Sequence, residues 1–442
     1  MLRVDAVQDS ATFPDKVDVV IIGGGIIGTS AAYELGRMGV SVALIEKGVI
    51  GGEQSGRNWG WVRQQNRRHD ELVMAMRSLQ RWSEIGPEIG RDLGFRRLGS
   101  LYGSVDPAEV EKWKKWSVRA KEIGYSFDIL SAGEIKSRLP NSTAPWVGGL
   151  CSPTDALAEP AMATSAIAEG AKHHGVHVLQ TCAARGLDIA AGKVAGVWTE
   201  RGLIRASTVV CAGGAWSSRL LRRHGIELPV ANIVGTAMRT SPLPELPGGT
   251  FNGPGFALRR RLDQGYTIAV PGYGRMELAP QGIRYSLKFY QTFRSKLTKQ
   301  LKIRIGASFF NGPEAAGSWE MDQISPFERI RVLNPAVDEE WLAQAVSNLK
   351  KCFPQMKDAR IVQSWAGLID TTPDLVPVIS RVDGLPGLIV ASGFSGHGFG
   401  LGPGAGLLVA ELATNREPYS DLEPFSLQRF NSGKKLIRPE MM

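Results

Sequence analysis

The chain of 442 residues has few cysteines and no long apolar run. Its cysteines are Cys151, Cys182, Cys211 and Cys352. Because their spacing is unpaired, we expect no metal site, no CxxC redox motif and no disulfide framework, and free thiols favour a reducing, cytoplasmic compartment. No apolar run reaches the roughly 18 residues of a membrane-spanning helix. The first apolar run, residues 17–22, follows Asp15 and contains Asp18, and its glycine-rich end does not resemble a signal peptide.

Nucleic-acid-binding motifs are also lacking, although the formal net charge is +9. We find no zinc finger, helix-turn-helix or aromatic RNA-binding signature, and we expect no nucleic-acid partner. The positive charge is local, because no acidic residue lies between Glu277 and Glu314. The cations of this segment are Arg284, Lys288, Arg294, Lys296, Lys299, Lys302 and Arg304.

Apolar residues recur in the same segment at spacings of three and four. They are Ile283, Leu287, Tyr290, Phe293, Leu297 and Leu301. This spacing predicts one basic amphipathic helix within an insertion at about 280–318. Such a helix favours peripheral contact with an anionic membrane through residues 283–305, at the cytoplasmic face of the inner membrane. The alternative is a helix whose apolar stripe packs on its own domain.

The strongest motif lies near the N-terminus. Residues 17–22 form a β-branched run without alternation, typical of a buried parallel strand, and G-x-G-x-x-G follows at Gly23, Gly25 and Gly28. A helical stretch at 29–38 and a second strand at 40–45 come next, and Glu46 ends that strand at the spacing of a ribose hydroxyl acceptor. The helix N-terminus would face a pyrophosphate, so the segment predicts dinucleotide binding.

Two distant segments favour FAD over NAD. Residues 207–216 form another strand that ends in small residues, and residues 387–400 form a late strand that runs into a glycine-rich turn. An extended, largely buried FAD needs such contributions from remote parts of the chain.

These motifs resemble those of the D-amino acid oxidase and sarcosine oxidase family of flavoproteins. The resemblance rests on the opening motif, on A-G-G-A-W at 212–216 and on G-F-S-G-H-G-F at 393–399, and it covers essentially the whole chain. Within the family the chain looks most similar to bacterial membrane-associated L-amino acid deaminases. That likeness rests on residues 45–48, 52–57, 325–328 and 423–427.

The resemblance implies an α/β fold, in which a Rossmann-like FAD-binding domain is interleaved with a smaller α+β substrate-binding domain carrying a mixed sheet. The FAD-binding pieces would be 1–66, 145–225 and 362–442. The substrate-binding pieces would be 67–144 and 226–361.

The resemblance also implies which residues hold the cofactor. Glu46 would bind the adenosine ribose, residues 55–58 would line the pyrophosphate and flavin, and residues 396–398 would lie beside the flavin ring. The full set is Gly23, Gly25, Ile26, Ile27, Gly28, Glu46, Lys47, Ser55, Gly56, Arg57, Asn58, Ala183, Ala184, Ala212, Gly213, Trp216, Gly393, Gly396, His397 and Gly398. Since no cysteine falls where a covalent flavin link could be argued, we expect noncovalent FAD.

The implied reaction is oxidation of an amino acid or secondary amine. Hydride would leave the α-carbon for flavin N5, and the resulting imine would be hydrolysed to a keto acid or aldehyde. The pocket should favour the neutral amine through desolvation or positive surroundings. Oxygen or a membrane quinone would accept the electrons. The alternative is a flavin dehydrogenase of 2-hydroxy acids or polyols.

The candidate substrate residues are His397, Trp365, Arg63, Gln64 and Arg275. For His397 and Trp365 the alternative role is packing, and for Arg63 it is an ordinary solvated arginine. Three departures from the relatives leave the carboxylate anchor unassigned. Gly400 stands where sarcosine oxidases carry a lysine, and Trp61 and Pro271 stand near a glutamine and an arginine of the deaminases. Arg275 lies close enough to Pro271 in sequence to substitute for that arginine.

Overall fold

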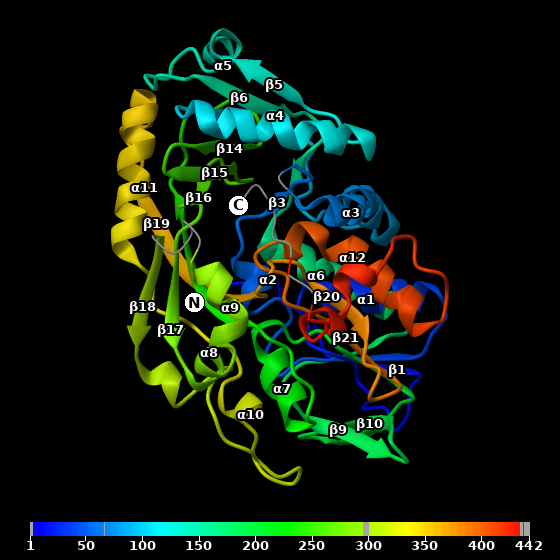
Figure 1. Cartoon of the computed structure of the whole chain (residues 1–442). Helices are drawn as coiled ribbons and strands as arrows, with labels where there is room; N and C mark the ends of the chain where they lie inside the picture. Colours follow the sequence, from blue (N-terminus) through cyan, green and yellow to red (C-terminus); the bar gives the residue numbers. More distant parts are fainter. Residues whose placement is uncertain (1–2, 66, 295–299, 434–435, 437–442) are drawn as a thin grey trace.

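The molecule has two halves in space, each built around a sheet, and a mostly parallel sheet forms the centre of one of them (Figure 1). The structure, a computed structural model, describes residues 3–65, 67–294, 300–433 and 436. The sheet has the order β20-β21-β12-β1-β2-β8, and only β20 runs antiparallel to its neighbour. Its strands are β1 (Val19–Ile22), β2 (Val42–Ile45), β8 (His177–Leu179), β12 (Thr208–Cys211), β20 (Val378–Arg381) and β21 (Leu388–Ser392). The fully buried β1 explains the uninterrupted apolar run in the sequence.

Alternate residues of β1 enter two cores on opposite faces of this sheet. Val19 and Ile21 pack with the helices α1 (Ile26–Arg37), α3 (His69–Ile89), α6 (Pro160–His173) and α12 (Gly398–Ala413). Val20 and Ile22 pack with the three-stranded antiparallel sheet of β9 (Ala184–Ala190), β10 (Lys193–Thr199) and β11 (Gly202–Arg205) and with α7 (Ser217–Arg223). The sheet therefore lies between two layers.

Glycines set how closely the helices approach one another. A Cβ at Gly28 would lie 1.9 Å from the Gly23 carbonyl oxygen, so α1 can follow β1 only with glycine there. In α12, a Cβ at Gly406 would lie 2.5 Å from the Ser30 Cβ of α1. The glycine-rich stretch after residue 400 is thus a helix packed on α1 and α3, rather than a continuation of the turn that precedes it.

A second, mixed sheet dominates the other half (Figure 1). Its order is β18-β17-β13-β16-β15-β14-β4-β6-β5, and β19 pairs with β13. The strands are β4 (Ser100–Ser104), β5 (Asp128–Ser131), β6 (Gly148–Ser152), β13 (Ala231–Thr240), β14 (Thr250–Gly253), β15 (Phe256–Arg260), β16 (Tyr266–Ala269), β17 (Gly274–Leu278), β18 (Leu301–Ile305) and β19 (Ile361–Thr371). The helices of this half include α4 (Pro107–Glu122), α5 (Ala132–Arg138) and α11 (Glu339–Cys352). The fold class inferred from sequence is confirmed: the α/β molecule combines a Rossmann-like sheet with a mixed one.

The two halves differ from the expected boundaries in three places. The helix α3, expected in the substrate-binding piece 67–144, packs instead in the core of the parallel sheet through Met74, Leu79 and Trp82. The strands β6 and β19, expected in the FAD-binding pieces, pair with β4 and β13 of the mixed sheet. Short elements connect the halves: α2 (Gln54–Arg57), α10 (Pro326–Arg329), and the pair β3 (Trp61–Val62) with β7 (Ala156–Leu157).

The expectation of one amphipathic helix over the basic segment is wrong. The segment forms α8 (Pro280–Arg284) and α9 (Ser286–Arg294), and Leu301 lies in β18, which pairs in parallel with β17. Residues 301–305 alternate apolar and basic, the period of a strand, so pairing with the free edge of β17 prevails there. Lys296, Leu297 and Lys299 lie outside the described residues.

A buried ion pair joins the two halves. Arg259 of β15 is 0% exposed and contacts Glu159, which precedes α6, at 2.9 Å. The Nε of Arg259 also donates to the Trp59 carbonyl oxygen, and Glu159 accepts from the Leu262 amide. Both charges are therefore paired and hydrogen bonded across the domain boundary.

We predict that Arg259→Met lowers the free energy of unfolding by about 3–5 kcal/mol, because Glu159 loses its close buried partner and keeps only the more distant Arg261. Urea denaturation monitored by circular dichroism measures the change. Arg261→Met is the matched control, since Arg261 is more exposed and lies 3.8 Å from Glu159. Its loss should cost about 1 kcal/mol or less, and equal losses in the two variants would contradict the prediction.

Candidate functional site

Three adjoining cavities run from the parallel sheet to the mixed sheet. The largest is about 580 Å³, the middle one about 130 Å³ and the smallest about 50 Å³. The large and middle cavities share Gln54, Asn58 and Gly396, whereas the middle and small ones share Glu46 and Trp216. Cavities joined in this way suit an extended ligand with a bulky group at each end, such as a dinucleotide.

The middle cavity has the features of a pyrophosphate site. Gly25 caps α1 without a side-chain hydrogen bond, and the first turn of α1 has no acidic residue, so the positive end of the helix dipole is free for an anion. Ser55 accepts a hydrogen bond from the Ile26 amide at 2.8 Å. On the facing turn a Cβ at Gly214 would meet no atom within 4 Å. The residues present fit the phosphates and ribityl chain of FAD.

Glu46 lies between the middle and small cavities, at the end of β2. Its carboxylate accepts from the Gly24 amide at 2.8 Å and from the Gly48 amide at 2.7 Å. Burial raises the pKa of Glu46. Beside it, the Lys47 ammonium lies 4.5 Å from the centre of the Trp216 ring and pairs with Glu53.

Most of the expected cofactor residues line these cavities, but five have another place or contact. Gly28, Gly56, Ala183 and Gly393 do not line any of the three cavities; Gly28 packs on Gly23, Ala183 donates to Glu200, and Gly393 packs on Thr372. Arg57 lines the large cavity, yet its guanidinium binds protein oxygens. Its acceptors are the carbonyls of Gly52, Leu333 and Ala366 and the side chain of Asn334, at 2.6–3.1 Å. Arg57 therefore ties the chain together instead of offering its charge to a phosphate.

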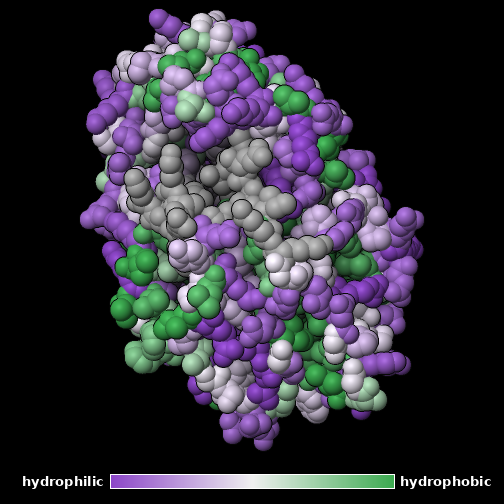
Figure 2. Space-filling view, viewed as in Figure 1, coloured by the Kyte–Doolittle hydropathy of each residue, from purple (hydrophilic) through white to green (hydrophobic). Residues whose placement is uncertain are grey.

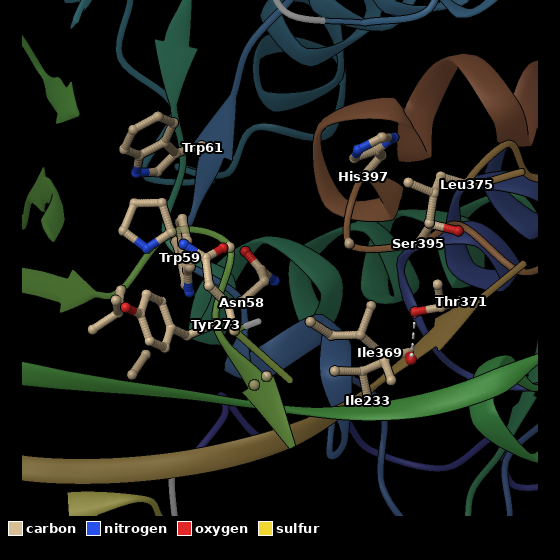
Figure 3. Close-up of a pocket in the computed structure, with 18 of the residues that line it drawn as sticks. Asn58, Trp59, Trp61, Ile233, Tyr273, Ile369, Thr371, Leu375, Ser395 and His397 are labelled. Atoms are coloured by element: carbon tan, nitrogen blue, oxygen red, sulfur yellow. Dashed lines mark hydrogen bonds between the residues drawn. The ribbon is translucent and has the colours of Figure 1, made fainter. Parts of the chain in front are cut away.

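Aromatic side chains and cations surround the large cavity. Figure 3 shows Trp59, Trp61 and Tyr273 on one side and His397 on the other, with Ile233 and Ile369 below them. The cations that line the cavity are Arg57, Arg63 and Arg67, against the single carboxylate of Glu109. The wall of the large cavity is therefore largely apolar and carries net positive charge.

His397 is 3% exposed and lies in the wall of the large cavity, directly before α12. Its Nδ1 lies 3.1 Å from a carboxylate oxygen of Glu71. Burial and the positive charge of Arg67 lower the pKa of His397 to about 4, so the imidazole is neutral near pH 7. Because a carboxylate only accepts, Nδ1–H donates to Glu71, and Nε2 keeps its lone pair.

Three other candidates lie outside the cavity lining. Arg275 is 1% exposed, forms a buried ion pair with Asp338 and does not line the large cavity, although its Nε lacks a hydrogen-bond acceptor among the described residues. Trp365 donates from Nε1 to the Arg57 carbonyl oxygen, and the Gln64 amide nitrogen donates to Thr154. These side chains support the wall from behind, and of the five candidates only His397 and Arg63 line the cavity.

Sequence reasoning missed Arg67, Glu71 and Tyr102 as residues of the site. The stretch 370–374 could also reach the pocket by its position after Trp365, with an ordinary polar turn as the alternative; Asp370, near the end of β19, lines the middle cavity and accepts from the Gly393 amide at 2.6 Å. Arg67 and Glu71 look like solvated charges at a helix start. Only the docking of α3 against α12 buries them, and no local signal in the sequence reports that docking.

The buried neutral state of His397 predicts a pH-dependent stability. The unfolded state takes up a proton near pH 6.5, whereas the folded state does so only near pH 4, so folding stability falls as pH drops through this window. Between pH 6.5 and 4.5 this group alone should remove roughly 2 kcal/mol. We expect His397→Asn to be less stable at pH 7 but to show a flatter dependence of unfolding free energy on pH. An unchanged slope would refute the assignment of a neutral histidine.

Comparison with known proteins agrees with this geometry. A solved L-amino acid deaminase from Proteus myxofaciens, in complex with anthranilate, superposes with a TM-score of 0.92 at 31% identity, covering 98% of this chain and 97% of that chain. An L-proline dehydrogenase from P. horikoshii gives a TM-score of 0.78 at 26% identity, covering 96% and 100%.

Among curated proteins, the sarcosine oxidase subunit beta of Arthrobacter sp is 27% identical over 426 residues, which cover 94% of this chain and 91% of that protein. The human mitochondrial sarcosine dehydrogenase is 24% identical over 96% of this chain, but the match covers only 42% of its own length. The family model for FAD dependent oxidoreductases (DAO) matches residues 18–412. With its line of nucleotide-shaped cavities beside a Rossmann-like sheet, the chain is an enzyme of the DAO family of FAD-dependent oxidoreductases.

Proposed function

We propose that this enzyme oxidises an amino acid or N-alkylated amino acid at the carbon beside nitrogen. The observation that carries the proposal is the large cavity itself, which continues from the nucleotide cavities and is lined by aromatic rings and by Arg63 and Arg67. FAD, bound noncovalently, would supply the acceptor for the hydride that leaves the α-carbon. The imine product would then be hydrolysed to a keto acid or aldehyde.

The charge of the cavity suits the protonation state that the reaction needs. An ammonium group entering beside Arg63 and Arg67 is disfavoured by like charge and by desolvation, so the substrate would lose a proton and bind as the neutral amine. His397 adds no charge, because its imidazole is neutral near pH 7. A dedicated base is therefore not required, and the contribution of the protein is to orient the substrate and exclude water.

The cofactor contacts that we propose follow the cavities. Glu46 would bind the adenosine ribose, Ser55 and the N-terminus of α1 the pyrophosphate, and Asn58, Gly396 and His397 the flavin end. The similar proteins are named as a deaminase, a proline dehydrogenase and a sarcosine oxidase subunit, all acting on amino compounds. A 2-hydroxy acid would meet the same cations, so it is the alternative substrate class.

Anaerobic flavin bleaching tests the proposal. The purified protein should be yellow, release FAD on denaturation and lose its absorbance near the flavin maximum when mixed with an L- or D-amino acid or an N-methyl amino acid. Ammonia or an alkylamine should form in proportion. Bleaching by 2-hydroxy acids alone, without an amine product, would establish the alternative, and colourless protein that cannot be reconstituted would refute both.

We further propose peripheral contact with an anionic membrane, where a quinone would accept the electrons. No helix of the described residues has the length and hydropathy to cross a bilayer. Instead, an apolar patch is exposed over α8, α9, β18 and the turn after it, and Figure 2 shows apolar side chains gathered on this part of the surface. The patch consists of Ile283, Leu287, Tyr290, Ile303, Ile305 and Phe310, and Leu287 is 88% exposed.

Cations stand beside the patch. They are Arg284, Lys288, Lys302 and Arg304, whose acceptors within the chain include Glu227, Glu340 and Asp338. Exposed ion pairs of this kind contribute little, so the cations can exchange these partners for lipid phosphates. The patch and its cations therefore match an anionic lipid surface better than a neutral one.

Sedimentation with phosphatidylglycerol vesicles tests the contact. We expect the protein to bind at low salt, to bind less at high salt, and to lose about tenfold in affinity on Leu287→Asp with Tyr290→Asp. Val118→Asp on α4 is the control, because Val118 is also exposed, at 62%, but lies at the other end of the molecule (Figure 1). Equal binding by all three proteins, or no binding by any, would rule out the patch as a membrane-binding surface.

A further inference from the structure

Arg67 is a buried arginine without a partner, placed in the wall of the large cavity. It is 3% exposed, and its Nε and Nη1 have no hydrogen-bond acceptor among the described residues. Within the same part of the chain it forms no ion pair. Every other arginine that lines the cavity has protein acceptors: Arg57 binds carbonyls, and Arg63 donates to Gln65 and to the Tyr102 hydroxyl.

A guanidinium left alone in the interior is costly, and it cannot escape the cost by losing its proton near neutral pH. Burial and Arg63 lower the pKa of Arg67 only to about 9. Two buried acids, Glu71 and Asp155, act on Arg67 through their charge, but no ion pair of the described residues joins either of them to it. One oxygen of Glu71 is held by His397 and one of Asp155 by the Gln64 backbone amide at 2.8 Å, and the other oxygen of each has no hydrogen-bond partner among the described residues. An anion that enters the cavity would therefore satisfy a donor that the protein itself leaves unsatisfied.

The position of Arg67 indicates that it would contact the substrate and not the cofactor. The residues shared by the large and middle cavities mark where the nucleotide would pass, and Arg67 lines only the large cavity. The shared residues are Gln54, Asn58, Gly396 and Phe399. Arg63, in the same lining, acts on Arg67 as a second positive charge, whereas His397 is neutral near pH 7. Gly400, in the same lining, has no side chain that could bind an anion in its place.

We propose that Arg67 binds the carboxylate of the substrate and thereby selects amino acids over simple amines. This inference rests on the proposed function, and it assigns the carboxylate anchor to a residue at the start of α3. Arg63, half-buried and already hydrogen bonded, adds positive charge. The pairing neutralises Arg67 and orients the carbon beside nitrogen with respect to the rest of the cavity.

A pair of matched ligands tests the assignment without turnover. Anthranilate and aniline share a ring and an amino group, and only anthranilate carries a carboxylate. Each is titrated into the FAD-loaded protein, and the dissociation constant is read from the change in the visible flavin spectrum. We expect Arg67→Met to raise the dissociation constant of anthranilate about 10- to 100-fold and to change that of aniline by about twofold or less.

Two further variants control for folding and for charge. Arg67→Lys keeps the charge in a shorter side chain, so the affinity for anthranilate should fall about 3- to 10-fold. This variant tests the assignment if Arg67→Met does not fold. Arg77→Met removes an arginine within α3 that does not line the cavity, and this variant should bind both ligands as the wild type does. For an amino acid that reduces the flavin, the Arg67 variants should raise KM by a larger factor than they lower kcat.

Three results would overturn the assignment. Equal weakening of anthranilate and aniline would make Arg67 a structural residue. Unchanged anthranilate affinity with a shifted flavin midpoint potential would assign Arg67 to the cofactor, and unchanged affinity and potential would leave it without a role. The outcome is separable from the proposed function: loss of anthranilate binding in a protein that no amino acid bleaches would support the anion site and refute amino-acid oxidation.

Discussion

The hydrogen bonds of the Arg57 guanidinium are the contact on which the site most depends. They reach Gly52 before α2, the loop at residues 333–334 and Ala366 of β19, so one buried side chain joins both halves of the molecule. The neighbouring residues Ser55 and Asn58 and the strand that carries Asp370 are positioned by this contact. Since the cavities lie between the two sheets, their shape depends on such side-chain cross-links more than on continuous strand pairing. The buried pair of Arg259 and Glu159 is a second side-chain link between the two halves.

The electrostatics of the interior follow a single pattern. Arginines face the large cavity, and no ion pair of the described residues joins Arg63 or Arg67 to an acid: Glu71 is bonded to His397, Asp155 to Gln64 and Glu159 to Arg259. A cavity organised in this way attracts anions and disfavours ammonium groups. It therefore combines, in one set of charges, the recognition of a carboxylate with a preference for the neutral amine. Binding and activation of an amino acid need not be assigned to separate residues.

The basic segment shows how local pattern and tertiary pairing compete. Its apolar residues recur at helical spacing up to residue 294, and two short helices form there. Residues 301–305 also alternate in the manner of a strand, and β17 offers them a free edge. The resulting surface exposes apolar side chains from both helix and strand, so the patch does not depend on a single amphipathic helix.

The sequence by itself determined the nucleotide half of this protein. Gly23, Gly25, Gly28 and Glu46 are read from local order, because a strand, a turn and a helix that follow one another place their glycines and their terminal acid without outside help. The fold class and the FAD-dependent family followed from the family resemblance that these motifs carry. The substrate end did not. Whether Arg275 or Arg67 faces the cavity depends on which acid each one meets, Asp338 or none, and that is decided by segments far apart in the chain. Only the tertiary structure brings such segments together, because the free energy of a buried charge is set by its neighbours in space.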